Sequence, residues 1–205
     1  DGIVSSFTEP ASWPERLTQK WKIPVGVGYA TPVLVGNRVY MFARQEASEV
    51  MMAIDADTGK VAWQTGYPAP VKIVPVAARH GEGPKSTPTF ANGRLYTLGM
   101  SGIVTAWDAS TGKVLWQKDA PAVGPAFGTA QSPLVDRGLV ILHVGGNNDG
   151  ALSAFDAATG AVKWAWPGDG PAYGSPVIVL AAGTRQVVTM AQRNLVGVSA
   201  ETGAL

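Results

Sequence analysis

The chain has 205 residues, and its 16 Lys and Arg against 15 Asp and Glu leave a formal net charge of +1. This balance excludes a typical nucleic-acid-binding domain, which would carry a clear basic excess. Apolar residues make up 46% of the chain and charged residues 15%, which excludes a disordered tail protein. The longest apolar run, residues 176–182, is too short for a transmembrane segment. No Cys is present, so disulfides, thiolate metal sites and a Cys nucleophile are also excluded.

A short motif recurs along the chain. Each complete copy has an Asp, then Thr-Gly, and then a Trp that lies eight residues after the Asp. A fourth copy covers residues 199–205, and residues 17–23 resemble the tail of an earlier copy. The motif residues are Asp55, Gly59, Trp63, Asp108, Gly112, Trp116, Asp156, Gly160, Trp164, Gly203 and Trp21. Because they occupy the same place in every repeat, we interpret them as structural residues and not as a unique catalytic group.

The Asp-x-x-Thr-Gly segment predicts a turn with a defined mechanism. The short carboxylate accepts hydrogen bonds from backbone N–H groups a few residues further on, and the Thr hydroxyl adds a bond to the same turn. The Gly adopts positive φ without a Cβ clash. The apolar residue and the Trp that follow lie two positions apart, so they share one face of a strand. We expect each indole to pack against the backbone of a neighbouring repeat.

A second landmark, a hydroxyl residue followed by Pro, precedes each motif. The four hydroxyl residues are Thr31, Thr87, Ser132 and Ser175. Between the landmarks, short apolar runs alternate with Gly and Asn clusters, which predicts four strands in each repeat of about 43–53 residues. This organisation is typical of the four-stranded antiparallel blades of an all-β propeller. We place the whole of 1–205 in one propeller region, with blades near 24–66, 84–118, 129–166 and 172–205, and with 16–23 as the outer strand of a preceding or closing blade.

The pattern Ala-x-Asp-x-x-Thr-Gly-x-x-x-Trp resembles the tryptophan-docking motif of the pyrroloquinoline-quinone (PQQ) propeller family. The resemblance covers essentially the whole chain. It implies a propeller that has eight blades in many members, with Trp side chains locking adjacent blades. The family includes quinoprotein dehydrogenases, which hold PQQ and Ca²⁺ on the propeller axis. It also includes non-catalytic relatives, such as the lipoprotein subunit of the outer-membrane assembly machinery, so membership implies a periplasmic or cell-surface location.

The closure of the ring has two interpretations. In one, the strand around Trp21 completes the fourth blade and closes a four-bladed ring. In the other, which we favour, the four blades are part of a larger ring of seven or eight blades. An open arc of blades exposes apolar faces and sheet edges, so we expect the isolated chain to self-associate.

The candidate ligand-binding residues lie in two loops. Strand order places all long loops on one face of the propeller, which is where binding usually resides. Residues 78–86 contain two cations, a His and a carboxylate, and residues 145–150 offer oxygen ligands that suit Ca²⁺. A solvated loop and an ordinary hairpin loop are the competing interpretations. The candidates are Arg79, His80, Glu82, Lys85, Asn147, Asn148 and Asp149.

No catalytic residue and no metal site are predicted, because the common nucleophile, metalloprotease and phosphate-loop motifs are absent from the sequence. His143 lies in an apolar strand, where we expect a buried, hydrogen-bonded residue. Two functions follow. The first is a non-catalytic scaffold that binds a protein, peptide or cell-envelope partner through its long-loop face, without a cofactor. The alternative is a dehydrogenase that uses PQQ and Ca²⁺ to oxidise an alcohol or sugar, although the adjacent Cys pair found in many alcohol-oxidising members is impossible here.

Overall fold

A computed structural model describes residues 8, 10–72 and 74–205. Within these residues, fifteen strands form three four-stranded sheets and one three-stranded sheet, and every strand pair is antiparallel. Each sheet takes its strands in chain order, so the repeats of the sequence are also the units of the structure. The all-β propeller fold predicted from the sequence is confirmed.

The four sheets have similar strand plans. The first contains β1 (Val33–Val35), β2 (Arg38–Gln45), β3 (Ser48–Asp55) and β4 (Val61–Pro68). The second contains β5 (Thr89–Ala91), β6 (Arg94–Leu98), β7 (Val104–Asp108) and β8 (Val114–Lys118). The third contains β9 (Leu134–Asp136), β10 (Leu139–Val144), β11 (Ala151–Asp156) and β12 (Val162–Trp166), and the fourth β13 (Val177–Ala181), β14 (Thr184–Met190) and β15 (Leu195–Ser199). A short 3₁₀ helix, η1 (Pro75–His80), lies between the first two sheets in the sequence.

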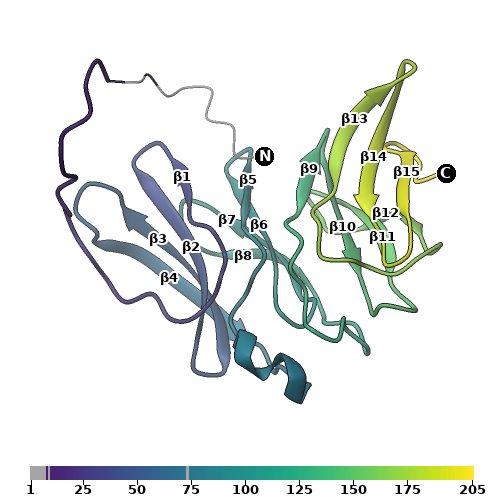
Figure 1. The fold of residues 1–205 in the computed structure, drawn as a ribbon, viewed down its shortest axis with the longest axis horizontal. Helices are drawn as coiled ribbons and strands as arrows, with labels where there is room; N and C mark the ends of the chain where they lie inside the picture. The colour runs from purple at the N-terminus through teal and green to yellow at the C-terminus, as the bar shows by residue number, and fades with distance from the viewer. Residues whose placement is uncertain (1–7, 9, 73) are drawn as a thin grey trace.

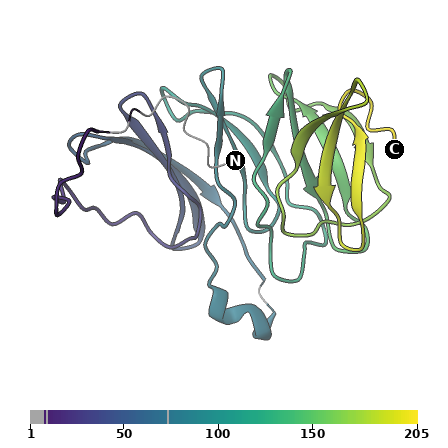
Figure 2. The same ribbon diagram turned by 45° about the horizontal axis from the view of Figure 1, so that its top comes forward.

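The sheets follow one another like the ribs of a fan (Figures 1 and 2). The short first strands form the inner side of the fan, since β1 contacts β5 and β5 contacts β9. Residues 16–23, expected as an outer strand, form none in the structure because no strand is hydrogen-bonded to them. They run beside the first sheet instead, where Trp21, Ile23 and Val25 pack against buried residues of β2 and β3.

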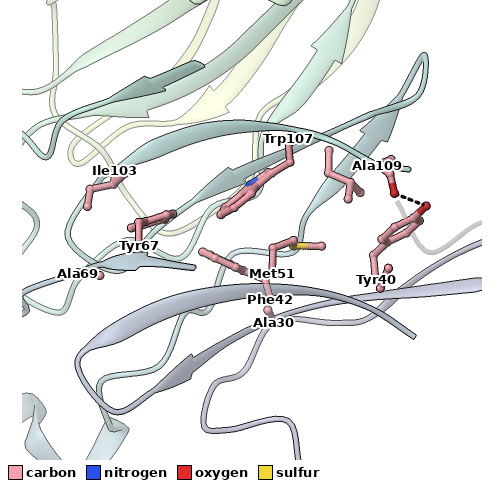
Figure 3. Packing of buried hydrophobic residues seen from close by; sticks show 11 residues of the cluster. Ala30, Tyr40, Phe42, Met51, Tyr67, Ala69, Ile103, Trp107 and Ala109 are labelled. Carbon is pink, nitrogen blue, oxygen red and sulfur yellow. Dashed lines mark hydrogen bonds between the residues drawn. The ribbon is translucent and has the colours of Figure 1, made fainter. Parts of the chain in front are cut away.

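Apolar side chains fill the space between neighbouring sheets. Between the first two sheets, Tyr40, Phe42 and Met51 pack with Trp107 of β7 in one buried cluster (Figure 3). The ring of Tyr67 stacks on that of Trp107 with 5.7 Å between centroids. Similar clusters join the second sheet to the third and the third to the fourth. The sheets are therefore held by inter-sheet cores, because no single sheet buries both of its faces by itself.

The recurring Trp residues connect each sheet to the next. The indole N–H of Trp63 donates to the carbonyl oxygen of Ala109 at 3.1 Å, and that of Trp116 donates to Ala157 at 3.1 Å. The same bond recurs from Trp21 to Ala56 and from Trp164 to Ala200. Each ring lies directly over the motif Gly of the next sheet, where an added Cβ would come within 2.4–2.8 Å of ring atoms at Gly59, Gly112, Gly160 and Gly203.

The motif Asp residues organise the turns. The Oδ1 of Asp108 accepts hydrogen bonds from the backbone N–H of Thr111 at 2.8 Å and from its hydroxyl at 2.9 Å, and Ser110 adds two more. These bonds, led by the one from the Ser110 hydroxyl, lower the pKa of Asp108 to about 2. Asp156 makes the equivalent bonds to Thr159, which lower its pKa to about 2 as well.

Candidate functional site

The two faces of the fan differ in the segments that they carry. On the turn face, short turns contact each other within a sheet, as where the Ala109 N–H donates to Gly93 O at 3.0 Å. On the link face, the loops between second and third strands meet the links, which are the segments that lead into the first strand of each sheet. There the Asn147 side chain donates to Pro171 O at 3.2 Å. The link face therefore holds the longer segments, as the strand order predicts.

A ladder of hydrogen bonds fixes the ends of the links around the inner side of the fan. The backbone N–H of Thr31 donates to the hydroxyl of Thr87 at 3.3 Å, and the N–H of Thr87 donates to the hydroxyl of Ser132 at 3.0 Å. The N–H of Ser132 donates in turn to the hydroxyl of Ser175 at 2.9 Å. The hydroxyl landmarks of the sequence thus tie each link to the next one. The Pro that follows each of them has no N–H and so cannot compete for these acceptors.

A pocket of about 380 Å³ opens on the link face beside this ladder, since four of its lining residues lie two positions before ladder residues. Four links contribute its walls, together with the end of η1. The lining residues of this link-face pocket are Tyr29, His80, Lys85, Phe127, Ala130 and Tyr173. Phe127 has its ring edge-to-face with Tyr173 at 6.4 Å between centroids and with His80 at 6.3 Å. The walls are therefore mainly aromatic, with imidazole and phenol groups at the rim.

Lys85 supplies the one ammonium group among the lining residues. Its Nζ donates to the carbonyl oxygen of Phe127 at 2.7 Å, which leaves further N–H groups of the ammonium for another acceptor. Partial burial lowers the pKa of Lys85. No ion pair involves Lys85 within the part of the chain that the structure describes. A cation placed in this way favours an anionic group in the pocket.

The candidates from residues 78–86 separate into two pairs. His80 and Lys85 line the pocket. Arg79 lies outside the lining, with its Nε 3.5 Å from Nε2 of His80. Glu82 faces the first sheet, where its carboxylate lies 3.5 Å from Nε of the buried Arg44. Glu82 therefore fastens the loop to the first sheet and does not reach the pocket.

The candidates from residues 145–150 have structural contacts. Asn147 accepts a hydrogen bond from the N–H of Ala126 at 3.3 Å and donates to Pro171, so it joins the links that carry Phe127 and Tyr173. Asp149 accepts from the N–H of Gly146 at 3.0 Å, inside its own loop, and Asn148 is exposed. Among the described residues, no group of three or more His, Asp or Glu is arranged to hold a metal ion.

Sequence reasoning missed four of the six pocket residues: Tyr29, Phe127, Ala130 and Tyr173. A signal for three of them was present, because Tyr29, Ala130 and Tyr173 each lie two positions before a hydroxyl landmark. Lys85 has the same position before Thr87. The spacing becomes meaningful only when the ladder shows that the landmarks are neighbours in space.

Two buried ionisable groups lie between sheets, outside the pocket. Glu49 is fully buried and accepts hydrogen bonds from the Tyr67 hydroxyl at 2.8 Å and from the N–H of Met100 at 2.6 Å. Burial raises its pKa, and the two hydrogen bonds oppose this rise. Tyr67 lies on β4 of the same sheet, whereas Met100 follows β6 of the second sheet, so the bond to Met100 joins the first sheet to the second.

His143 is buried, but the expectation that its side chain is hydrogen-bonded is wrong. Among the described residues, neither ring nitrogen has a partner at normal hydrogen-bond geometry, although the buried Asp169 lies close to the ring. Burial lowers the pKa of His143 to about 4, and the backbone of Asp169, followed by its carboxylate, opposes this only in part. The imidazole is therefore neutral at pH 7.

Comparison with known proteins extends these observations. A family model described as outer membrane protein assembly factor BamB matches residues 48–205. The dehydrogenase subunit of the quinone alcohol dehydrogenase of Acetobacter aceti is 32% identical over 148 residues, which cover 66% of this chain and 19% of that protein. BamB of Yersinia pestis is 29% identical over 161 residues, which cover 76% of this chain and 38% of that protein. The chain thus spans well under half the length of these relatives.

The solved structures agree with the fold. The crystal structure of quinohemoprotein alcohol dehydrogenase from Comamonas testosteroni superposes with a TM-score of 0.58 at 22% identity, over 85% of this chain and 33% of that one. No helix among the described residues has the length and apolar character needed to cross a bilayer. From the match over residues 48–205, the shared repeat and the fan of antiparallel sheets, the chain belongs to the BamB family of propellers with PQQ-like repeats.

Proposed function

We propose that this chain is a non-catalytic binding module whose link-face pocket holds a segment of a protein of the cell envelope. The observation that carries the proposal is the pocket itself, where aromatic rings from separate links surround one ammonium group. Aromatic side chains are enriched where proteins recognise one another. Loops held on a rigid scaffold are the usual place for such recognition, and here each link is tied to its neighbour by the hydroxyl ladder.

The relatives support a role in the envelope. One of them is named as an assembly factor for outer membrane proteins, which is a role exercised on other proteins. A periplasmic or cell-surface location for this chain is part of the proposal. The recurring Trp contacts then serve the scaffold, since they hold successive sheets in the register that brings the links together.

A photo-crosslinking experiment tests this function. A benzophenone amino acid is placed at the exposed Val123 of the link face or at the exposed Thr184 near the turn face, and the protein is expressed in a bacterial periplasm. We expect one discrete protein adduct from position 123, its loss when Phe127→Ala is added, and none from position 184. Equal adducts from both faces, or an adduct from position 123 that is indifferent to Phe127→Ala, would argue against the proposal.

The alternative function is a dehydrogenase that depends on PQQ and Ca²⁺, and relatives with quinone alcohol dehydrogenase names favour it. The lining of the link-face pocket does not fit that pair of groups. The pocket lining contains no carboxylate or amide side chain to coordinate Ca²⁺, and its one fixed charge is the ammonium of Lys85. We derive no catalytic step from the quinone.

An absorbance titration with PQQ and Ca²⁺, followed by a dye-linked assay of alcohol oxidation, distinguishes the two functions. We expect neither a saturable spectral change nor turnover. Saturable reconstitution with turnover would refute the non-catalytic proposal.

A further inference from the structure

We propose that the link-face pocket recognises a peptide segment in which an aromatic side chain lies next to a carboxylate, with the ring above Ala130 and the carboxylate at Lys85. This inference rests on the proposed function and specifies the chemistry of the partner. In this inference, the peptide is selected mainly by one residue of each repeat, the residue two places before the hydroxyl landmark. We call this place the pocket position.

The ladder explains why the pocket positions converge. Each hydroxyl residue is bonded to the next one, from Thr31 through Thr87 and Ser132 to Ser175. Residues at a fixed distance before them are therefore held side by side, however long the rest of each link is. The four pocket positions hold Tyr29, Lys85, Ala130 and Tyr173, and all four line the pocket. The repeat thus supplies a frame in which one residue per link is free to set specificity.

The small side chain of Ala130 leaves space for a ligand side chain among the pocket positions. The other three pocket positions carry long side chains, and the methyl group of Ala130 leaves a hollow between Lys85 and Tyr173. A volume of about 380 Å³ is near the lower end of the roughly 300–1,000 Å³ usual for small-ligand sites. One aromatic side chain with its adjacent backbone suits a hollow of this size.

The walls are arranged to accept a further ring. The ring of Phe127 meets that of Tyr173 at an interplanar angle of 83° and that of His80 at 72°, so both pairs are in edge-to-face contact. Edge-to-face contact is one of the preferred geometries of aromatic pairs. These rings are only half-buried; Phe127 is 37% exposed and Tyr173 43% exposed, which leaves apolar surface for an incoming aromatic group.

The positive charge of Lys85 favours a carboxylate beside the aromatic side chain of the peptide. Within the described residues, the ammonium of Lys85 makes one hydrogen bond, to the carbonyl oxygen of Phe127. The carboxylate closest in sequence, that of Glu82, is directed to Arg44 and does not neutralise it. A ligand carboxylate would supply a charge-assisted hydrogen bond at this point. The same contact would offset the burial that lowers the pKa of Lys85.

Three unlabelled tetrapeptides, two of sequence Gly-Gly-Gly-Phe, test the chemistry by isothermal titration calorimetry. One peptide has a free C-terminal carboxylate, a second has a C-terminal amide, and a third, Gly-Gly-Phe-Asp amide, carries its carboxylate on a side chain. We expect at least one of the two acidic peptides to bind about tenfold more tightly than the Gly-Gly-Gly-Phe amide. The preferred acidic peptide then identifies a chain end or an internal acidic residue as the source of the carboxylate.

Matched variants test the assigned residues. Lys85→Met should reduce the affinity of the acidic peptide to that of the amide, while Lys72→Met, on the same link but outside the pocket, should not. Ala130→Trp should abolish binding by filling the hollow, while Ala122→Trp, at an exposed position of the same link, should leave it intact. Circular dichroism and thermal melts confirm that each variant is folded.

The outcomes separate this inference from the proposed function. Equal binding of acid and amide, or an acid preference that survives Lys85→Met, would overturn the inference. If wild type binds none of the peptides but the crosslink from position 123 persists, the inference fails and the proposed function stands. If that crosslink is absent as well, both fail.

Discussion

The outer faces of the first and fourth sheets are both apolar, but only that of the first sheet is covered by another segment. At the first sheet, Trp21, Ile23 and Val25 cover the face that points away from the second sheet. At the fourth sheet, Val187 and Val198 are buried against the third sheet, so residues of alternate parity point away from it. That outer face carries exposed apolar side chains at Val177, Val179, Met190 and Leu195.

This difference shows that the repeat pattern does not decide burial by itself. An interior sheet of the fan needs apolar residues on both faces, because it contacts a neighbouring sheet on each side. The two end sheets follow the same repeat pattern and so have apolar residues on both faces as well. A face becomes core only where another segment lies on it. The N-terminal segment supplies that cover at the first sheet, without pairing as a strand.

The largest expected effect compares an interior Trp with the Trp at the covered end. Trp116→Ala should destabilise the protein by about 3–5 kcal/mol, because the indole is buried between two sheets. Trp21→Ala should cost less, since it removes cover from one end only. Urea unfolding measures both, with the half-exposed Leu115→Ala as control. Equal losses for the two Trp variants would show that the end segment is as firmly packed as the interior.

A second prediction concerns the effect of acid on the buried His143 of the third sheet. His143 has a pKa of about 4 in the folded protein against 6.5 in the unfolded chain, so protons bind preferentially to the unfolded state between these values. Stability should therefore decline as the pH falls from about 6.5 to 4, by about 3 kcal/mol in all. His143→Leu should lack this decline in chemical unfolding measured at several pH values.

The comparison with His143→Leu isolates the imidazole from other titrating groups. The raised pKa of Glu49 acts with the opposite sign, because a buried carboxyl is easier to accommodate when it is protonated. Asp108 and Asp156, whose pKa values are lowered, affect stability at lower pH. Their stabilising effect is complete above about pH 4 and is lost as the pH falls toward 2. Parallel pH profiles for wild type and His143→Leu would contradict the role given to the imidazole.

A pair of glycines separates ring contact from backbone strain. Gly112 and Gly93 both have positive φ, +75° and +73°, but only a Cβ at Gly112 would meet the Trp63 ring, at 2.4 Å. Gly93→Ala should cost about 1–2 kcal/mol from the left-handed backbone alone, and Gly112→Ala should cost clearly more. Thermal and urea unfolding measure the difference. Similar costs would mean that Trp63 moves away easily, and would weaken the role of the indole contacts.

The smallest expected effect concerns association through the uncovered end. Charged residues at the exposed Val179 and Leu195, introduced as Val179→Lys and Leu195→Lys, should weaken self-association about tenfold, or about 1.4 kcal/mol. Their effect on folding should be small, because both side chains face solvent. Light scattering over a concentration series measures association, and Lys substitution at the exposed Thr184 is the control. A wild-type chain that stays monomeric at all concentrations would contradict the expectation of self-association.

Much of the fold was predictable because its rules are local. The bonds from Thr111 to Asp108 join residues three apart, and the positive φ of Gly112 belongs to the same turn. A spacing of eight residues then places Trp116 on the following strand. Such short-range constraints repeat with the sequence, so strands, turns and the order of the sheets could be derived without coordinates.

The candidate site was predictable only in part. His80 and Lys85 were identified from the chemistry of their loop, and both line the pocket. Glu82 and Asn147 have equally suggestive side chains, but Arg44 and Pro171 engage them, and these partners are distant in the sequence. Residue type alone does not distinguish a side chain that is free to bind a ligand from one that fastens a loop.

The sequence by itself determined the repeat, its turns and the landmarks that end each link, because hydrogen bonds and strand alternation over a few residues depend on neighbouring residues only. Tertiary structure decided which residues share the pocket and which sheet face is covered. Those outcomes depend on how links of different length converge on the ladder and on where the N-terminal segment lies, and both are set by contacts between residues tens of positions apart.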